Sequence, residues 1–399
     1  MSLKELRSVI IEEVEKNKEK YINISHSIHE KPEIGNEEFF ASKILTSKLE
    51  EEGFQVERNI AGHATAFIAR KKNRYKNGPV IGYLAEYDAL PGLGHACGHN
   101  IIGAASVAAA ISLGKVLDKT GGEVVVFGTP AEEGGENGSA KGSFVRENIF
   151  HGTDVCMMIH PSNETSPSST SLAVDPLDFE FIGKPAHAAA CPEKGINALD
   201  AIIQLFNGIN ALRQHVTSDV RIHGIITHGG DMPNIVPEYA KARFYIRAAT
   251  RKKCDQVTNR VKDIARGASF ATGAKLNIIS FQNPVDNLIR NEALDDIFID
   301  NVRYLGEEIR TDIVKGIGST DAGNVSHVIP TIHPYIKIGE STLVSHTKEF
   351  CEAAISKKGD KGLILGAKVL ALTGLTLLIE TDRLNKIKEE FNNQKSCEI

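Results

Sequence analysis

The sequence predicts an α/β protein in which a largely parallel sheet, flanked by helices, is interrupted by a small ferredoxin-like α+β domain. Two observations support this prediction. Short, almost wholly apolar runs alternate with longer helical segments from about residue 80 onward, which is typical of strands buried on both faces. The middle of the chain instead follows the order β-α-β-β-α-β, the pattern of a split βαβ unit.

The chain begins with a predicted amphipathic helix. Ser2-Leu3-Lys4-Glu5 has the form of a capping box, in which a serine and a glutamate three residues apart satisfy each other's backbone N–H groups. Leu6, Ile10 and Val14 then recur at helical spacing among many charges. This pattern favours a surface helix over a signal peptide.

Four apolar runs are predicted to form strands of the main sheet. They are Val80–Ala85, Val124–Phe127, Val155–Ile159 and Tyr335–Ile338. Asn100–Leu117 is rich in Ala and Gly, so we expect a helix there that packs closely against the sheet.

The middle of the chain predicts a compact inserted domain over residues 173–285. The main α/β domain would then consist of residues 1–172 and 286–399, as a length of 399 residues also suggests two domains. The elements expected in the insertion are, in order, a strand at Leu177–Ile182, a helix over 199–212, strands at Arg221–Thr227 and Ala240–Arg247, a charged helix over 251–268 and a strand at Lys275–Phe281.

Composition excludes some classes of function. The net charge is −5 and the basic residues are dispersed, so nothing favours a nucleic-acid partner.

The apolar stretch Gly362–Ile379 contains Lys368 and three glycines, which favours a buried core helix over a membrane span. None of the six cysteines forms a C-x-x-C pair, so we expect free thiols and a cytoplasmic location.

The strongest local signal for chemistry is the segment Gly94-His95-Ala96-Cys97-Gly98-His99-Asn100. Two histidines and a cysteine within five residues offer ligands suited to zinc or a similar metal. Gly98 allows the backbone to turn so that Cys97 and His99 can face one point. A chance cluster near a turn is the alternative for this segment taken alone.

Polar side chains also follow three of the predicted strands. The loop segment itself follows the first run through Glu86-Tyr87-Asp88, Glu132 and Glu133 follow the second run, and His160 follows the third. In open α/β sheets, sites form beyond the carboxyl ends of the strands, so these groups should meet in one crevice. One of the adjacent glutamates could bind metal while the other transfers a proton, although such a pair is more often only a solvated loop.

With these motifs in place, the chain resembles the aminoacylase/carboxypeptidase family of di-metal amidohydrolases, in the branch with a Gly-His-x-Cys-Gly-His loop. That branch contains N-acyl-amino-acid hydrolases, p-aminobenzoyl-glutamate hydrolase and dipeptidases acting on β-alanyl or similar dipeptides. The resemblance spans nearly the whole chain. Its further motifs are His29–Gly35, Glu37-Glu38, Gly183–His187, Asn234–Pro237, Gly318–Asp321 and Ser345-His346.

The resemblance implies a zinc-exopeptidase-like catalytic domain that binds two divalent metal ions. The implied metal ligands are Cys97, His99, Glu133, His160 and His346, with Cys97 able to bridge the two ions. Glu132 would be the general base, acting on a hydroxide held between the metals, and Asp88 would orient a ligand. Zinc is the default ion, with manganese and cobalt left open.

The resemblance assigns the inserted domain to closure over the site and to dimerisation. His187 would stabilise the oxyanion in the partner's active site, although taken alone it could be a satisfied turn histidine. Asn234 and Arg247 would hold the substrate carboxylate, and Arg247 could equally be a surface ion-pair partner. We therefore expect a homodimer or homotetramer without a nucleic-acid or membrane partner.

The expected activity is hydrolysis of the amide bond in a small N-acyl amino acid or dipeptide with a free carboxylate. Asn100, followed by Ile101 and Ile102, departs from the more common loop with Asp at that position, and resembles the dipeptidase-like subgroup. The alternative is a catalytically silent carboxylate-binding or scaffolding relative of the same fold. Gly92-Leu93-Gly94 lacks the third glycine of a dinucleotide motif, and no Gly-x-Ser-x-Gly occurs.

Overall fold

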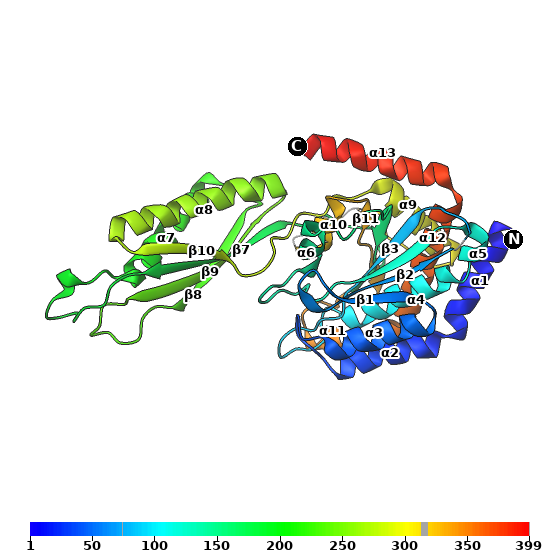
Figure 1. Ribbon diagram of the computed structural model, residues 1–399, viewed down its shortest axis with the longest axis horizontal. Helices are drawn as coiled ribbons and strands as arrows, with labels where there is room; N and C mark the ends of the chain where they lie inside the picture. Colours follow the sequence, from blue (N-terminus) through cyan, green and yellow to red (C-terminus); the bar gives the residue numbers. More distant parts are fainter. Residues whose placement is uncertain (74, 313–317, 399) are drawn as a thin grey trace. The chain divides into compact units, whose positions relative to one another are not determined.

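A computed structural model of the protein describes residues 1–73, 75–312 and 318–398 (Figure 1). The α-helices are α1 (Leu3–Lys16), α2 (Lys18–Glu30), α3 (Phe39–Glu51), α4 (His99–Gly114), α5 (Leu117–Thr120), α6 (Ala140–Arg146), α7 (Ala198–Leu212), α8 (Arg251–Thr272), α9 (Glu292–Tyr304), α10 (Ala322–Ser326), α11 (Lys348–Ala353), α12 (Lys357–Ile379) and α13 (Thr381–Glu398). Short 3-10 helices are η1 (Pro192–Lys194) and η2 (Arg213–His215). The strands are β1 (Gln55–Ile60), β2 (His63–Lys72), β3 (Val80–Ala85), β4 (Glu123–Gly128), β5 (Val155–Met157), β6 (His160–Ser162), β7 (Ala173–Ile182), β8 (Arg221–His228), β9 (Tyr239–Ala248), β10 (Lys275–Ser280), β11 (Thr331–Ile332) and β12 (Tyr335–Lys337).

The chain divides into two compact units. The first unit comprises residues 1–170, 288–312 and 321–398, and the second comprises residues 171–287 with 318–320. The sequence alone suggested an inserted domain with boundaries at residues 173 and 285. The second unit therefore lies between two parts of the first along the chain.

The first unit contains a six-stranded sheet of order β1-β2-β4-β3-β5-β11. The strands β4, β3, β5 and β11 run parallel, whereas β1 and β2 are antiparallel neighbours at one edge. Both faces are buried, because Val124 and Val126 of β4 belong to one apolar cluster while Val125 and Phe127 belong to another. Helix α4 covers the first face, and α6 and α10 contribute to the second cluster.

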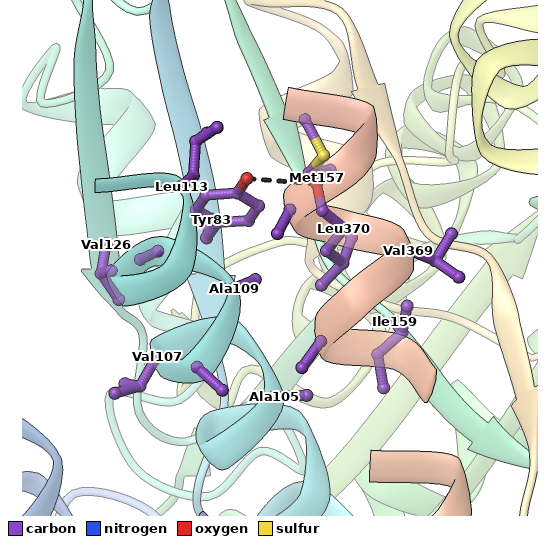
Figure 2. Close-up of a cluster of buried hydrophobic side chains, with 14 of the residues drawn as sticks. Tyr83, Ala105, Val107, Ala109, Leu113, Val126, Met157, Ile159, Val369 and Leu370 are labelled. Carbon is purple, nitrogen blue, oxygen red and sulfur yellow. Dashed lines mark hydrogen bonds between the residues drawn. The ribbon is translucent and has the colours of Figure 1, made fainter. Parts of the chain in front are cut away.

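Helices α4 and α12 form the densest part of this core (Figure 2). Every residue of α4 is buried, which its many Ala and Gly residues permit by allowing close approach. The hydroxyl of Tyr83 donates to the carbonyl of Leu370 at 3.1 Å, so β3 and α12 are joined by a buried hydrogen bond. A Cβ added at Gly374 would lie 2.5 Å from both Leu113 Cδ2 and the Tyr83 hydroxyl oxygen, which explains the glycine at that contact.

The apolar stretch near the C-terminus forms α12. This helix is long and apolar enough to cross a membrane, but 83% of its most apolar window is buried inside the fold. A core helix passes the same test of length and composition. The prediction of a buried core helix is confirmed.

The second unit is a four-stranded antiparallel sheet of order β10-β7-β9-β8. Strand β9 alternates strictly between buried and partly exposed residues, as expected for a sheet with one covered face. Helices α7 and α8 pack against each other on that covered face (Figure 1). The predicted β-α-β-β-α-β order is confirmed.

Some elements differ from the prediction. The antiparallel pair β1 and β2 was not predicted, because β1 has no continuous apolar run and β2 has only a short one, over residues 66–69, followed by charged residues. The prediction that Tyr335–Ile338 joins the main sheet is wrong, because strand β12 pairs with β6 in a separate two-stranded sheet. The predicted strand Val155–Ile159 ends at Met157, and the helix predicted over Asn100–Leu117 ends at Gly114.

Candidate metal centre

The sheet brings the predicted polar side chains together. Asp88 follows β3, Glu132 and Glu133 follow β4, and these two strands are parallel neighbours. His160 comes shortly after β5, which pairs with β3 on its other side, and is itself the first residue of β6. The carboxyl ends of three adjacent parallel strands therefore deliver their side chains to one place.

The loop from Gly94 to Gly98 adds two more candidate ligands. Gly98 has a φ of +77°, and a Cβ at this position would lie 2.7 Å from Pro161 Cγ. Backbone conformation and space both demand glycine here. The turn at Gly98 begins helix α4 and places Cys97 and His99 on either side of it.

His346 reaches the same loop from the C-terminal part of the chain. Its backbone N–H donates to the carbonyl of Ala96 at 2.9 Å, and its φ of +63° lies in the left-handed region. Non-glycine residues rarely adopt that conformation, and such strain is concentrated at functional sites. The imidazole is about half exposed, and its Nε2 lies 3.7 Å from Glu133 Oε1.

The side chains form three overlapping groups with ligand atoms within 4.8 Å of one another. The groups are Cys97 with His99 and His160, Cys97 with Glu133 and His346, and His99 with Glu132 and Glu133. Cys97 belongs to two of these groups, and its Sγ lies 3.4 Å from His160 Nε2. All five predicted metal ligands thus fall within these overlapping groups.

These residues fit divalent metal ions. His99 Nε2 and Glu133 Oε1 are buried and have no hydrogen-bond partner in the described part of the chain. Buried polar atoms normally have a hydrogen-bond partner. The lack of one at these two atoms indicates a missing partner, such as a bound ion. Thiolate, imidazole and carboxylate donors together suit zinc and similar ions.

Asp88 lies directly behind two of these ligands. Its Oδ1 is 2.8 Å from His99 Nδ1, and its Oδ2 accepts the backbone N–H of Glu133 at 3.0 Å. With Nδ1 of His99 held in this way, its Nε2 is left to face the centre. This is the contact that orients metal-binding histidines in proteins.

The electrostatic surroundings of Glu132 differ from those of a residue in a solvated loop. Burial raises the pKa of its carboxyl well above the usual range, and the Glu86 and Glu133 carboxylates raise it further. Its Oε2 lies 3.9 Å from His99 Nε2. A largely buried carboxyl with raised proton affinity is suited to accepting and returning a proton near neutral pH.

The neutral forms of several ligands are favoured before a cation binds. Burial lowers the pKa of His160 to about 3 and raises the pKa of the Cys97 thiol. Burial would also lower the pKa of His99, but the Asp88 carboxylate and the Cys97 sulfur outweigh it and raise that pKa. Metal binding at this centre therefore requires proton release, and metal affinity rises with pH.

Sequence reasoning missed a buried ion cluster beside these ligands. Lys141 Nζ lies 2.7 Å from Glu86 Oε1 and 2.5 Å from Asp321 Oδ1, and all three side chains are at most 1% exposed. Nothing in the sequence marks Lys141, since lysine in a polar loop is almost always exposed. His95, by contrast, was a candidate from the loop motif but belongs to none of the three ligand groups.

The remaining predicted site residues lie in the second unit. His187 is exposed, and its Nδ1 accepts the backbone N–H groups of Ala189 and Ala190 at 3.2 Å each. These hydrogen bonds assign the ring proton to Nε2. Asn234 is exposed, and its backbone carbonyl accepts the N–H of Ala188.

Arg247 is held by neutral partners in the second unit. Its Nη1 donates to Ser319 Oγ at 2.8 Å, and its Nε lies 3.3 Å from His223 Nε2. Neither partner is a carboxylate, so these contacts do not support the surface ion-pair interpretation. The guanidinium therefore keeps its charge available to an anionic group.

Comparison with known proteins agrees with this architecture. Residues 177–271 match the peptidase dimerisation domain family. The chain is 36% identical to human Xaa-Arg dipeptidase over 386 residues, covering 92% of this chain and 88% of that protein. It is 29% identical to a component of the p-aminobenzoyl-glutamate hydrolase of Escherichia coli K12, covering 97% of this chain and 95% of that protein.

The fold is also that of a solved metallopeptidase. A dinuclear metal-binding peptidase of the M20 family from Bacillus subtilis superposes with a TM-score of 0.61 at 19% identity, covering 90% of this chain and 99% of that chain. The predicted resemblance is thereby confirmed. Together with the high-coverage similarity to the two hydrolases, these findings show that the chain belongs to the M20 family of metal-dependent peptidases and amidohydrolases.

Proposed function

We propose that this protein is a two-metal dipeptidase that hydrolyses small dipeptides with a free C-terminal carboxylate. The observation that carries the proposal is the sharing of Cys97 between two ligand groups beside the largely buried carboxyl of Glu132. One group would hold each ion, with Cys97 common to both. Metal-dependent amide hydrolysis is the chemistry of the family, and neither quoted relative supports a silent binding protein.

The substrate class is supported by the relatives. The human protein is named for dipeptides of the form Xaa-Arg and the bacterial one for an aminobenzoyl amide of glutamate. Both names describe an amide or peptide bond next to a free amino-acid carboxylate. Dipeptides ending in a basic residue are therefore the first substrates to test, followed by N-acyl amino acids.

The chain's own residues divide the work of catalysis. When bound, a pair of divalent ions supplies Lewis-acid polarisation of the carbonyl and lowers the pKa of water. Glu132 takes a proton from the attacking water and returns it to the leaving amine. His187 keeps its Nδ1 occupied by two backbone N–H groups, so its Nε2–H would be free to donate to the developing oxyanion in the active site of the partner subunit. Asn234 and Arg247 would hold the substrate carboxylate.

Metal identity, assembly and location are further parts of the proposal. Zinc is the proposed ion because one thiolate and three imidazoles outnumber the carboxylate, with manganese and cobalt as alternatives. The dimerisation domain supports at least a homodimer, and two dimers could pair as a homotetramer. Five cysteines whose side chains are described are free thiols, which supports a cytoplasmic location.

A substrate panel tests this function directly. Protein reconstituted with Zn²⁺, Mn²⁺ or Co²⁺ would be assayed on Xaa-Arg and Xaa-Lys dipeptides, β-alanyl dipeptides, N-acetyl amino acids and p-aminobenzoyl-glutamate. We expect the highest kcat/KM on a dipeptide, with loss of turnover after chelation. Turnover confined to N-acyl amino acids would make the protein an aminoacylase, and absence of turnover on every member would contradict the proposal.

A further inference from the structure

The buried cluster of Glu86, Lys141 and Asp321 has no part in the function described so far. The ammonium of Lys141 contacts one oxygen of each carboxylate, at 2.7 and 2.5 Å, and none of the three side chains reaches solvent. A fully buried lysine is rare, and a buried ion cluster is seldom retained for stability alone. Its position relative to the metal centre therefore matters.

One end of the cluster faces the metal centre. The second oxygen of Glu86, Oε2, lies 3.5 Å from His99 Nε2, the atom that faces the candidate ions. This oxygen is buried and has no hydrogen-bond partner in the described part of the chain. Lys141 holds the other oxygen, so it determines which way the Glu86 carboxylate points.

Hydrogen bonds at the other end of the cluster hold the loop that carries Glu132 and Glu133. This loop runs from the end of β4 to the start of α6, and Lys141 is the second residue of α6. The backbone N–H of Lys141 donates to Asp321 Oδ2 at 3.2 Å while its side chain binds Asp321 Oδ1. At the beginning of the loop, Glu38 Oε1 accepts the N–H of Ala131 at 2.9 Å. Buried carboxylates therefore accept hydrogen bonds from the loop at both of its ends.

We propose that Lys141 is a positioning residue for the hydrolytic reaction, which with Asp321 fixes the Glu132 loop and with Glu86 fixes the surroundings of His99. This inference rests on the proposed function, because positioning matters only where Glu132 transfers protons. A misplacement of about 1 Å in such a site costs on the order of a hundredfold in rate. Lys141 acts without touching the substrate.

The first test is the substitution Asp321→Asn in the full-length, metal-loaded protein. This variant keeps Lys141 paired with Glu86, so the remaining buried pair is neutral overall and folding is expected to survive. We expect kcat to fall about tenfold or more while KM stays within about threefold. A purely structural role would lower the melting temperature without this separation of kcat from KM.

A second variant removes every charge of the cluster. Glu86→Gln, Lys141→Met and Asp321→Asn combined leave similar volumes and no buried ion, a replacement that other proteins tolerate well. The melting temperature should therefore match or exceed that of the single variant, while kcat should stay depressed by at least about tenfold. Recovery of kcat to within about threefold of the wild type would overturn the proposal.

The matched control is an ion pair at the start of β4, the strand whose other end leads into the Glu132 loop. Arg70 and Glu123 are joined at 3.1 Å at the start of β4, whereas Glu132 follows its other end. Arg70→Met with Glu123→Gln neutralises this pair and should leave kcat within about twofold. A comparable loss of kcat in this control would mean that any disturbed ion pair slows the enzyme, and would also overturn the proposal.

Zn²⁺ affinity, measured by chelator competition, separates this inference from the proposed function. Loss of a group that orients a metal ligand typically weakens binding by about tenfold or more, and we expect this in the triple variant because it removes the charges beside His99 Nε2. Weaker Zn²⁺ binding in the triple variant, together with a wild type inactive on the whole panel, would defeat the dipeptidase proposal while leaving the cluster's hold on the surroundings of His99 supported. If the wild type is active and the triple variant has unchanged Zn²⁺ affinity and unchanged kcat, the inference is contradicted and the dipeptidase proposal stands.

Discussion

The carboxylate of Asp88 contacts two candidate ligands at once, His99 through Nδ1 at 2.8 Å and Glu133 through its backbone N–H at 3.0 Å. Asp88 is 1% exposed and belongs to the short segment after β3, the central strand of the parallel part of the sheet. A single buried carboxylate therefore couples the helix α4 side of the centre to the loop after β4.

Substitution of Asp88 by alanine should weaken metal binding. Removing the acceptor frees the His99 ring to rotate and leaves the Glu133 N–H without a partner, and such changes typically cost 10- to 100-fold in affinity, here taken as about 30-fold. Chelator competition with Zn²⁺ measures the effect. Affinity within about twofold of the wild type would show that Asp88 does not orient the ligands.

Cys97→Ser should remove more than one ion. Cys97 is common to two ligand groups, and a serine hydroxyl is a poor metal ligand at neutral pH, so both ions lose a donor. We expect the metal content per chain to fall from about two to below about one after dialysis against metal-free buffer. Cys191→Ser, at a partly exposed free cysteine in the second unit, is the control and should retain both ions.

His187→Ala should reduce turnover without affecting stability. The side chain is exposed, so its removal should change the free energy of unfolding by no more than about 0.5 kcal/mol. Loss of one oxyanion donor typically costs about 10²- to 10³-fold in kcat. The comparison is with His215→Ala, an exposed histidine of η2. Equal kcat values for the two variants would remove His187 from the mechanism.

Asp295 should make folding stability depend on pH. Burial raises the pKa of its carboxyl to about 6, above the value of about 3.9 in an unfolded chain. Because the folded pKa is raised, the stabilising contribution is complete below about pH 4 and is lost as the pH rises through about 6. The two pKa values correspond to a change of up to about 3 kcal/mol.

Asp295→Asn removes this titration while keeping an acceptor for the backbone N–H of Ser168. The free energy of unfolding of the wild type minus that of the variant, measured by urea denaturation, should therefore decrease between about pH 4 and about pH 7. This range spans both pKa values. A difference that stays constant, or that grows in the opposite direction, would contradict the raised pKa.

The meeting of the candidate metal-binding groups was predictable because strand ends and ligand chemistry coincide in the sequence. Apolar runs identify β3, β4 and β5, and the loop with Cys97 and His99, the pair Glu132 and Glu133, and His160 follow them in turn. His346 was predictable only through the family resemblance, because its place beside Cys97 depends on a long-range contact of its backbone with Ala96.

Other features could not be predicted, for physical reasons. Strand β1 lies at the edge of the sheet and is mostly exposed, so it has no apolar pattern, while β2 beside it ends in the charged residues Arg70, Lys71 and Lys72. Burial of Lys141 depends on carboxylates 55 and 180 residues away in the chain, and no local pattern reports such a pairing. Strand β12 has the composition of a core strand but pairs with β6, which composition cannot reveal.

The measurement that tests the account most directly is turnover and metal content of Glu132→Gln beside the wild type on the best dipeptide. Glutamine keeps the shape of the side chain but cannot carry the proton, and Cys97, His99, Glu133, His160 and His346 remain in place. We predict two ions per chain in both proteins and a loss of kcat of at least about 10³-fold in the variant. Substantial turnover by Glu132→Gln with both ions bound would contradict the assignment of Glu132 as the base.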